Sequence, residues 1–426
     1  MKRANGKSYL IIGLLLILVG IFTLIGSVKL FRNVANLTMI LILLITIKDL
    51  FSLIVKKPKL DSKLFIRIFN CFIAIIALIF NEYSIAIIPI IFALYALLNA
   101  SIYFVNFIIV KINNIKGEYK YFFCFIIYFI VGVLVLFRPI IHIGFMLNII
   151  GIYSILLGST FISDYLEINH MRKVPRIRIS LPSIIEAIIP ISTLQRINRT
   201  MNSEEMIEYD LNKKNIKPDL EILIHVNESG YGRLGHMDIY FDKEVISFGN
   251  YDISTYKFHD LIGTGVIFIV PSKRKYVKWC IEDNKKTLFS FGLKLNKKEK
   301  EQIRENILKI KSELKPWYCP YQQEKQKKFF VNKKKYNDYS SRLYRATKAK
   351  FYKFKKSKYK IFFALGNNCV SMANKIICKS LKDKFKFYGV LTPGTYYDYL
   401  EREYMKKNSI VVSKKIYSKN NIDKIT

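Results

Sequence analysis

Long uncharged apolar runs fill the first part of this 426-residue chain, and they leave it few ways to fold. Residues 9–28 form the first such run, which is long enough to cross about 30 Å of hydrocarbon at about 1.5 Å per residue. Lys2, Arg3 and Lys7 precede it. A signal peptide has a shorter apolar core and a small-residue cleavage site behind it. This segment has neither, so we predict a retained membrane span.

Similar runs predict six spans in all, which would pair into three helical hairpins. Residues 92–98 and 150–156 are weakly alike, as repetition of a hairpin unit would explain. Gly13 and Gly132 lie in the first helix of their hairpins. With these features, residues 8–163 resemble the HdeD-like family of small bacterial membrane proteins, which implies a six-helix membrane module and little about chemistry. The predicted spans are residues 9–28, 37–55, 64–80, 84–110, 121–137 and 140–163.

Lys and Arg gather before the first span and after the second, fourth and sixth, whereas the other loops hold few. Short loops rich in Lys and Arg stay in the cytoplasm, so both termini are expected there. A composition rich in Ile, Lys, Asn and Tyr is typical of an AT-rich bacterial genome. We therefore expect a multi-pass protein of a bacterial cell membrane.

Lys48 and Asp49 are an ionisable pair inside a predicted span. Such residues would suit a transporter or a proton relay. We favour a simpler interpretation, in which Lys48 reaches the interface near a helix end and Asp49 pairs with Arg67 or another polar group.

A connector follows the spans. Residues 172–178 are basic and would bind anionic headgroups, and residues 181–194 are apolar with prolines at 182 and 190. We predict an interfacial amphipathic helix for 181–194. The alternative, a seventh crossing, would place the rest of the chain outside the cell. The predicted domains are a membrane domain at 1–163, the connector at 164–217, a catalytic domain at 218–402 and a basic tail at 403–426.

The soluble part has strand-like runs separated by turn residues and one clear helical period. We predict strands at 221–226, 236–241, 244–248, 264–270, 276–281 and 358–365, and helices at 297–314 and from residue 369 onward. The expected fold class is an all-α transmembrane bundle followed by an α+β domain.

The formal net charge is +36, and residues 324–360 mix lysines and aromatics. On a free protein this mixture would suggest nucleic acid. On a tethered domain, attraction to the bilayer and its anionic headgroups is simpler, so nucleic acid is not expected. The six cysteines have no regular spacing, so we expect neither disulfides nor a metal site, and no motif predicts a cofactor.

Cys369 is the best candidate nucleophile. It follows an apolar run and the turn Gly366, Asn367, Asn368, and it opens an amphipathic helix. A thiol at a helix N-terminus is favoured as thiolate, and the free N–H groups there can stabilise an oxyanion. His236, after a Gly-rich turn and at the start of a strand, is the best-placed base. Taken singly, each residue has a structural explanation, as a buried thiol or a turn histidine.

The order of histidine strand before cysteine helix resembles the circularly permuted papain-like hydrolases of the NlpC-type superfamily, including the lecithin retinol acyltransferase-like enzymes. The resemblance covers residues 218–402. It implies Cys369 as nucleophile, preceded by Asn368, and His236 as base. It also implies a histidine-orienting group on the next strand, where Ser247 and Asn250 are the candidates. Substrate class does not transfer.

The expected function is a membrane-tethered cysteine hydrolase or acyltransferase that acts on an amide, ester or thioester through an acyl-enzyme. Asn368 and Tyr396 are candidates for the substrate or oxyanion site, although the tyrosines around Tyr396 equally suit an aromatic packing stripe. Peptidoglycan would be a substrate only outside the cell. The alternative is a non-catalytic membrane scaffold or sensor that retains a degenerate hydrolase fold.

Overall fold

The computed structural model describes most of the chain. The described residues are 7–26, 28–55, 75, 79, 86–115, 117–139, 143–170, 189, 192–193, 210–212, 216–226, 235–283, 286–327, 332, 335–377, 381, 392–406 and 408–418. They form two compact units, one of Ile11–Phe107 with Tyr119–Phe161 and one of Met1–Leu10, Ile108–Glu118 and Ile162–Thr426. We describe each unit by itself.

Apolar helices build the N-terminal region, as expected for a membrane-associated protein. Five helices in the described part of the chain are long and apolar enough to cross a membrane. The predicted span at 64–80 and the predicted interfacial helix at 181–194 fall almost entirely outside the described residues. The helices are α1 (Lys7–Ile25), α2 (Val28–Val55), α4 (Ile87–Ile112), α5 (Glu118–Phe137) and α6 (Ile143–His170).

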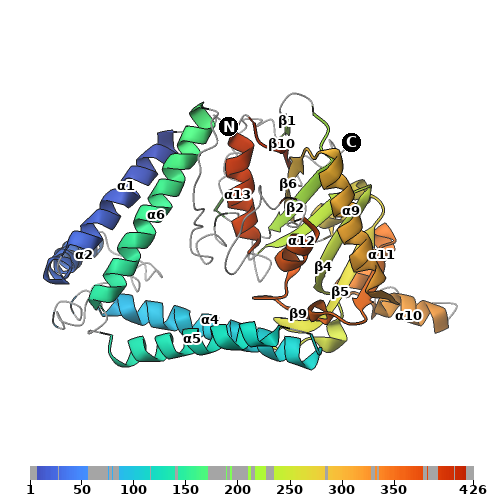
Figure 1. Ribbon diagram of the computed structural model, residues 1–426, viewed down its shortest axis with the longest axis horizontal. Helices are drawn as coiled ribbons and strands as arrows, with labels where there is room; N and C mark the ends of the chain where they lie inside the picture. Colours follow the sequence, from blue (N-terminus) through green and yellow to red (C-terminus); the bar gives the residue numbers. More distant parts are fainter. Residues whose placement is uncertain are drawn as a thin grey trace. The chain divides into compact units, whose positions relative to one another are not determined.

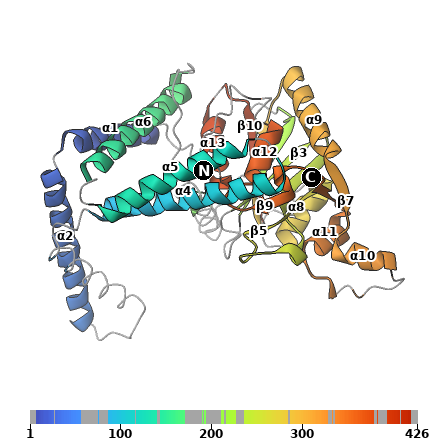
Figure 2. The same cartoon turned by 60° about the horizontal axis from the view of Figure 1, so that its bottom comes forward.

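Glycines let α1 and α6 approach closely, and the two helices lie side by side (Figures 1 and 2). A Cβ at Gly158 would lie 2.6 Å from the carbonyl oxygen of Gly13, and one at Gly20 would lie 2.7 Å from that of Gly151. Because lipid is as apolar as the side chains, helices in membranes associate largely through such close backbone packing.

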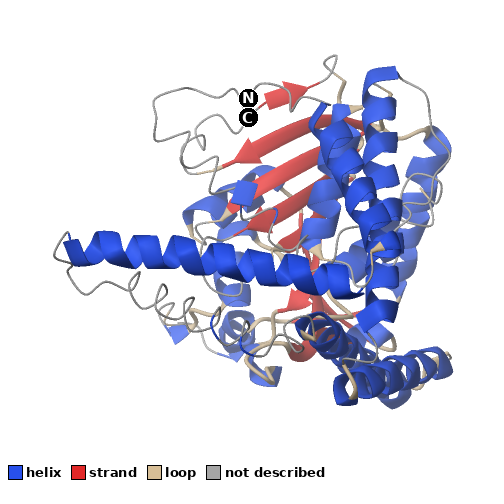
Figure 3. Ribbon diagram, turned by 90° about the vertical axis from the view of Figure 1, so that its left-hand side faces the viewer, coloured by secondary structure: helices blue, strands red, loops and turns tan. Residues whose placement is uncertain are grey.

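An antiparallel sheet is the centre of the C-terminal α/β domain (Figure 3). Its strand order is β1-β10-β6-β2-β3-β4-β5-β8-β7, with β9 paired to β5. The strands β2, β3 and β4 are neighbours, which sets their residues side by side. The strands are β1 (Asp210–Asn212), β2 (Leu220–Val226), β3 (His236–Phe241), β4 (Glu244–Asn250), β5 (Ile262–Val270), β6 (Thr287–Leu293), β7 (Leu314–Trp317), β8 (Lys350–Phe354), β9 (Ile361–Phe363) and β10 (Val411–Tyr417).

Helices cover both faces of this sheet with separate apolar cores. Alternating residues such as Ile222 and Ile239 face α9, α12 and α13, whereas Leu223 and Phe268 face α8 and α11. This division follows from the two-residue period of a strand. The helices are α8 (Lys273–Glu282), α9 (Lys297–Ser312), α10 (Pro320–Lys327), α11 (Tyr339–Thr347), α12 (Cys369–Ile377) and α13 (Pro393–Met405), with short 3₁₀ turns η2 (Ile253–Thr255) and η4 (Lys358–Lys360).

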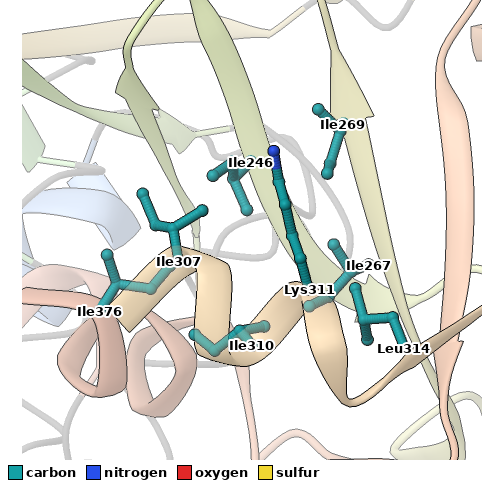
Figure 4. A pocket seen from close by; sticks show the side chains of 8 residues that line it. All are labelled: Ile246, Ile267, Ile269, Ile307, Ile310, Lys311, Leu314 and Ile376. Atoms are coloured by element: carbon teal, nitrogen blue, oxygen red, sulfur yellow. The ribbon is translucent and has the colours of Figure 1, made fainter. Parts of the chain in front are cut away.

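A tight apolar seam holds α9 and α12 against the sheet (Figure 4). Ile246 and Ile269 come from the strands, Ile307 from α9 and Ile376 from α12. The ammonium of Lys311, which reaches across this seam, lies 2.6 Å from the Glu244 carboxylate. The seam is therefore part of the core and presents no cluster of polar groups to a ligand.

The prediction of a strand at 276–281 is wrong, because these residues lie in helix α8. The Ser272 side chain accepts a hydrogen bond from the Lys275 N–H and so caps the helix. Tyr276, Val277 and Cys280 are buried at the one-turn spacing of a helix. Alternation over so short a run cannot distinguish the two periods.

Two other differences concern the ends of the soluble domain. The expected strand at 358–365 divides into η4 and the short β9. Residues 403–426, expected as a tail, include β10, which pairs with β1 and β6 inside the sheet. Its sequence, Val411 to Tyr417, contains lysines that hid the strand period.

Candidate active site

Cys369 begins helix α12 directly after a tight turn. In that turn the Gly366 N–H donates to the Phe363 carbonyl (3.0 Å), and the Phe363 N–H donates to the Asn367 carbonyl (3.2 Å). The Asn368 side chain then caps the helix by accepting from the Ser371 N–H (3.0 Å). Cys369 is 6 % exposed, and α12 packs against β3 and β4. The first N–H groups of a helix have no acceptor within the helix. The N-terminal end of α12 therefore favours a negatively charged group.

His236 opens β3 and is held there by the glycine before it. Gly235 has φ +80°, which L side chains rarely adopt, and a Cβ on it would lie 3.1 Å from Pro393 at the start of α13. The Cys369 side chain is close enough to the imidazole to raise its pKa. The His236 side chain is 21 % exposed.

Three polar groups surround Nε2 of His236. Ser247 Oγ lies 2.9 Å away, Tyr251 Oη 3.0 Å away and Asp238 Oδ1 3.0 Å away. The Tyr251 ring folds back over Gly249, where a Cβ would lie 2.7 Å from its Cζ atom. The ring orientation of His236 is thus determined by a hydroxyl pair and a carboxylate.

Asp238 also binds a second histidine. Its Oδ2 lies 2.6 Å from His225 Nε2 and accepts a hydrogen bond from the Tyr276 hydroxyl (2.6 Å). His225 and His236 are cross-strand partners on β2 and β3. The Asp238 side chain is fully buried, and a buried carboxylate is tolerated only with such partners.

Burial and neighbouring charged groups shift the pKa values of His236, Asp238 and His225. Burial lowers the pKa of His236, but interactions with Cys369 and Asp238 outweigh burial and raise it to about 10. Burial would raise the pKa of Asp238, but the two histidines hold it well below its ordinary value. Burial also lowers the pKa of His225 to about 4. Near neutral pH, His236 is therefore a cation and His225 is neutral.

Cys280 is the second thiol near this network, with Sγ 4.0 Å from His225 Nδ1. Burial raises its pKa to about 12, so it remains a thiol. Among the described residues, no group of three or more His, Cys, Asp and Glu side chains is arranged to hold a metal ion.

The structure brings together Cys369, His236 and Ser247. It places Asn250 elsewhere, because the Asn250 amide donates to the Asp260 carbonyl (3.3 Å) in the β4–β5 loop. Asn250 lies three positions after Ser247, so a strand directs their side chains to opposite faces.

The other two predicted residues have packing roles. The Asn368 amide donates to the Ala364 carbonyl (2.9 Å), in addition to its capping bond. The Tyr396 hydroxyl donates to Asn374 Oδ1, which ties α13 to α12.

Sequence reasoning overlooked Asp238 and Tyr251. Asp238 follows His236 by two residues in a predicted strand, so the two-residue period alone places both side chains on one face. Tyr251 carried no such signal, because it lies beyond the end of β4 and reaches back across Gly249.

A scan against protein-family models, a search of curated proteins and a search of solved structures each return no match for this chain.

Proposed function

We propose that this chain is a membrane-anchored enzyme whose soluble domain transfers or hydrolyses acyl groups through Cys369 and His236. The observation that carries the proposal is Cys369 at a helix N-terminus beside His236, whose Nε2 lies within 3.0 Å of Ser247, Tyr251 and Asp238. Covalent acyl catalysis commonly uses a nucleophile, a base that activates it and a third group that orients the base. The resemblance to circularly permuted papain-like hydrolases supports it through the order of the same elements.

The proposed reaction has two halves. The Cys369 thiolate attacks the carbonyl carbon of an ester, thioester or amide, and first-turn N–H groups of α12 stabilise the oxyanion. As the intermediate collapses, the bond to the leaving group breaks and His236 donates its proton to that group. Water or an amine then attacks the thioester, His236 takes up its proton, and the thiolate is released.

Asp238 would act as the orienting carboxylate in this scheme. It stays ionised and is held by Tyr276 and His225, so it can stabilise the imidazolium without taking its proton. Ser247 and Tyr251 would fix the ring plane. This assignment replaces Asn250 as the third group.

The membrane context of the enzyme is part of the proposal. Lys and Arg in alternate loops support a cytoplasmic C-terminal domain in a multi-pass protein. A membrane-proximal acyl substrate, such as a lipid or a lipidated peptide, then suits the tether.

Labelling with a lipid-like acyl electrophile tests the proposal. We expect one labelled thiol, lost in Cys369→Ala and strongly slowed in His236→Ala. Cys319→Ala is the matched control, because Cys319 is buried with a raised pKa caused mainly by burial, and its loss should change nothing. Labelling that spreads over several cysteines, or that ignores His236, would favour the scaffold or sensor.

A further inference from the structure

Exposed aromatic and aliphatic side chains gather at one point of the soluble domain. Among the described residues from 210 onward, the exposed large hydrophobic residues are Ile253 (48 %), Tyr256 (37 %), Phe258 (73 %), Leu308 (59 %) and Tyr318 (46 %). Three of them share the loop that joins β4 to β5. We call residues 253–260 the tip. A cluster of exposed apolar side chains usually marks an interaction surface.

Backbone and side-chain hydrogen bonds hold the tip in shape. The Tyr256 hydroxyl donates to the Asn250 carbonyl (2.9 Å), and the Thr264 N–H donates to Thr255 Oγ1 (2.9 Å). Lys257 and Ile262 exchange two backbone hydrogen bonds. These hydrogen bonds fix the backbone of the tip, so its apolar side chains stay exposed.

The backbone at the end of the tip keeps Phe258 turned outward. Phe258, His259 and Asp260 have φ values of 52°, 53° and 62°, the left-handed region that non-glycine residues rarely occupy. Such conformations cost free energy and persist where the surrounding structure imposes them. An exposed phenylalanine on a strained turn is therefore a feature that the fold maintains.

Positive charge surrounds the tip. Lys257 is exposed within it, and Lys355, Lys356 and Lys360 are exposed in the turn between β8 and β9. That turn is adjacent, because β9 pairs with the first residues of β5 (Figure 1). Asp260 is the acidic residue of the tip, and neighbouring Asp252 is neutralised by Lys353 at 2.6 Å.

The same backbone connects the tip to the cysteine. The Ala364 N–H donates to the Leu261 carbonyl (3.0 Å), and residues 364–368 are the turn before Cys369. A molecule that contacts the tip therefore lies near the N-terminus of α12.

We propose that the tip is a membrane-contacting surface, which inserts Phe258 among lipid headgroups and sets the cysteine turn against a bilayer containing anionic lipid. Aromatic side chains favour the interfacial region, and lysines are attracted to an anionic membrane surface. The chain's own candidate spans keep a bilayer at high local concentration, so a few weak contacts suffice. This surface is independent of the proposed catalysis, and its test needs no turnover.

The test uses the full chain reconstituted in vesicles of phosphatidylcholine and phosphatidylglycerol with brominated acyl chains. Phe258→Trp places a fluorophore at the tip, whereas the two native tryptophans, the buried Trp279 and the partly buried Trp317, supply the wild-type background. We expect bromine to quench Phe258→Trp well beyond the wild type. The matched control is Leu308→Trp, an exposed aliphatic position on α9, which should be quenched no more than the wild type.

Two further experiments test whether anionic lipid and the lysines beside the tip contribute to membrane contact. Replacing phosphatidylglycerol by phosphatidylcholine, or the double change Lys355→Glu and Lys356→Glu, should reduce the extra quenching of Phe258→Trp. Equal quenching of Phe258→Trp and Leu308→Trp would overturn the proposal. So would emission at position 258 that shifts to the blue without lipid quenching, because a protein surface would then cover the tip.

Discussion

Nε2 of His236 lies 3.0 Å from Oδ1 of Asp238, two residues further along the same strand. A strand turns every second side chain to one face, so this contact needs no long-range folding event beyond the formation of β3. It gives the proposed catalytic histidine a buried anionic partner on its own strand, which Tyr276 and His225 also contact.

Asp238→Asn should lower the pKa of His236, because it removes one of the two charges that raise it to about 10. The alkaline limb of the pH profile for acyl-ester turnover should then move to lower pH. The turnover rate at the pH optimum should fall about 10²-fold, because the general acid and base is no longer correctly oriented. The pH profile of the variant checks this. An alkaline limb that stays in place would contradict the role of Asp238.

The same shift predicts how stability depends on pH. The pKa of His236 is raised above its ordinary value of 6.5, so imidazolium stabilises the folded state fully below pH 6.5. That contribution is lost as pH rises through about 10. The melting temperature of the wild type in detergent should fall as pH rises through this range. In His236→Gln this dependence on pH should be weaker. A variant with the same slope would place the titration elsewhere.

Ser247→Ala and Tyr251→Phe should each slow labelling of Cys369 modestly, since a hydrogen bond contributes about 0.5–1.5 kcal/mol net. The two hydroxyls contact each other at 2.8 Å as well as His236. Their effects should therefore couple, and the double variant should differ from the product of the single effects. A double-mutant cycle on labelling rates measures this coupling, and strict additivity would show that the hydroxyls act separately.

Gly235→Ala should destabilise the soluble domain by about 1–3 kcal/mol, because its left-handed backbone is strained for alanine. It should also slow labelling, since the added Cβ meets Pro393 next to His236. Gly117→Ala is the matched control: Gly117 has φ +100° with nothing within 4 Å of a Cβ. If both variants slow labelling equally, the contact with Pro393 is irrelevant.

Local patterns predicted the parts of the site that depend on one element. The helix from Cys369 and the strand from His236 follow from periodicity, whereas Ser247 was one of two candidates that the family resemblance implied. Asn250 could not be excluded without the register, and Tyr251 reaches His236 only because Gly249 lacks a side chain. Strand β10 was not predicted, because its lysines interrupt the apolar alternation of a strand. Lys414, for example, pairs with Glu401 on α13.

Arg402→Ala should lower the free energy of unfolding of the soluble unit by about 3 kcal/mol, the range for breaking a buried ion pair. Arg402 on α13 lies 3.1 Å from Asp164 near the end of α6 and also pairs with Asp398. The side chains of Arg402 and Asp164 are 12 % and 3 % exposed. Thermal unfolding in detergent measures the loss. Lys278→Ala should have no effect, since its pair with Glu282 is 62 % and 50 % exposed. Equal melting temperatures would mean that the buried pair contributes nothing.

Gly158→Leu should separate α1 from α6 within the membrane unit. The first atom of the new side chain would lie 2.6 Å from the Gly13 carbonyl oxygen, and backbone on both sides cannot yield without moving the helices. Overpacking of this kind costs about 1–3 kcal/mol or more. Gly144→Leu on the same helix is the control, because the nearest atom to its Cβ is 4.0 Å away. Melting in detergent should fall for Gly158→Leu alone. If both variants melt alike, helix association in this unit does not rely on the glycine contact.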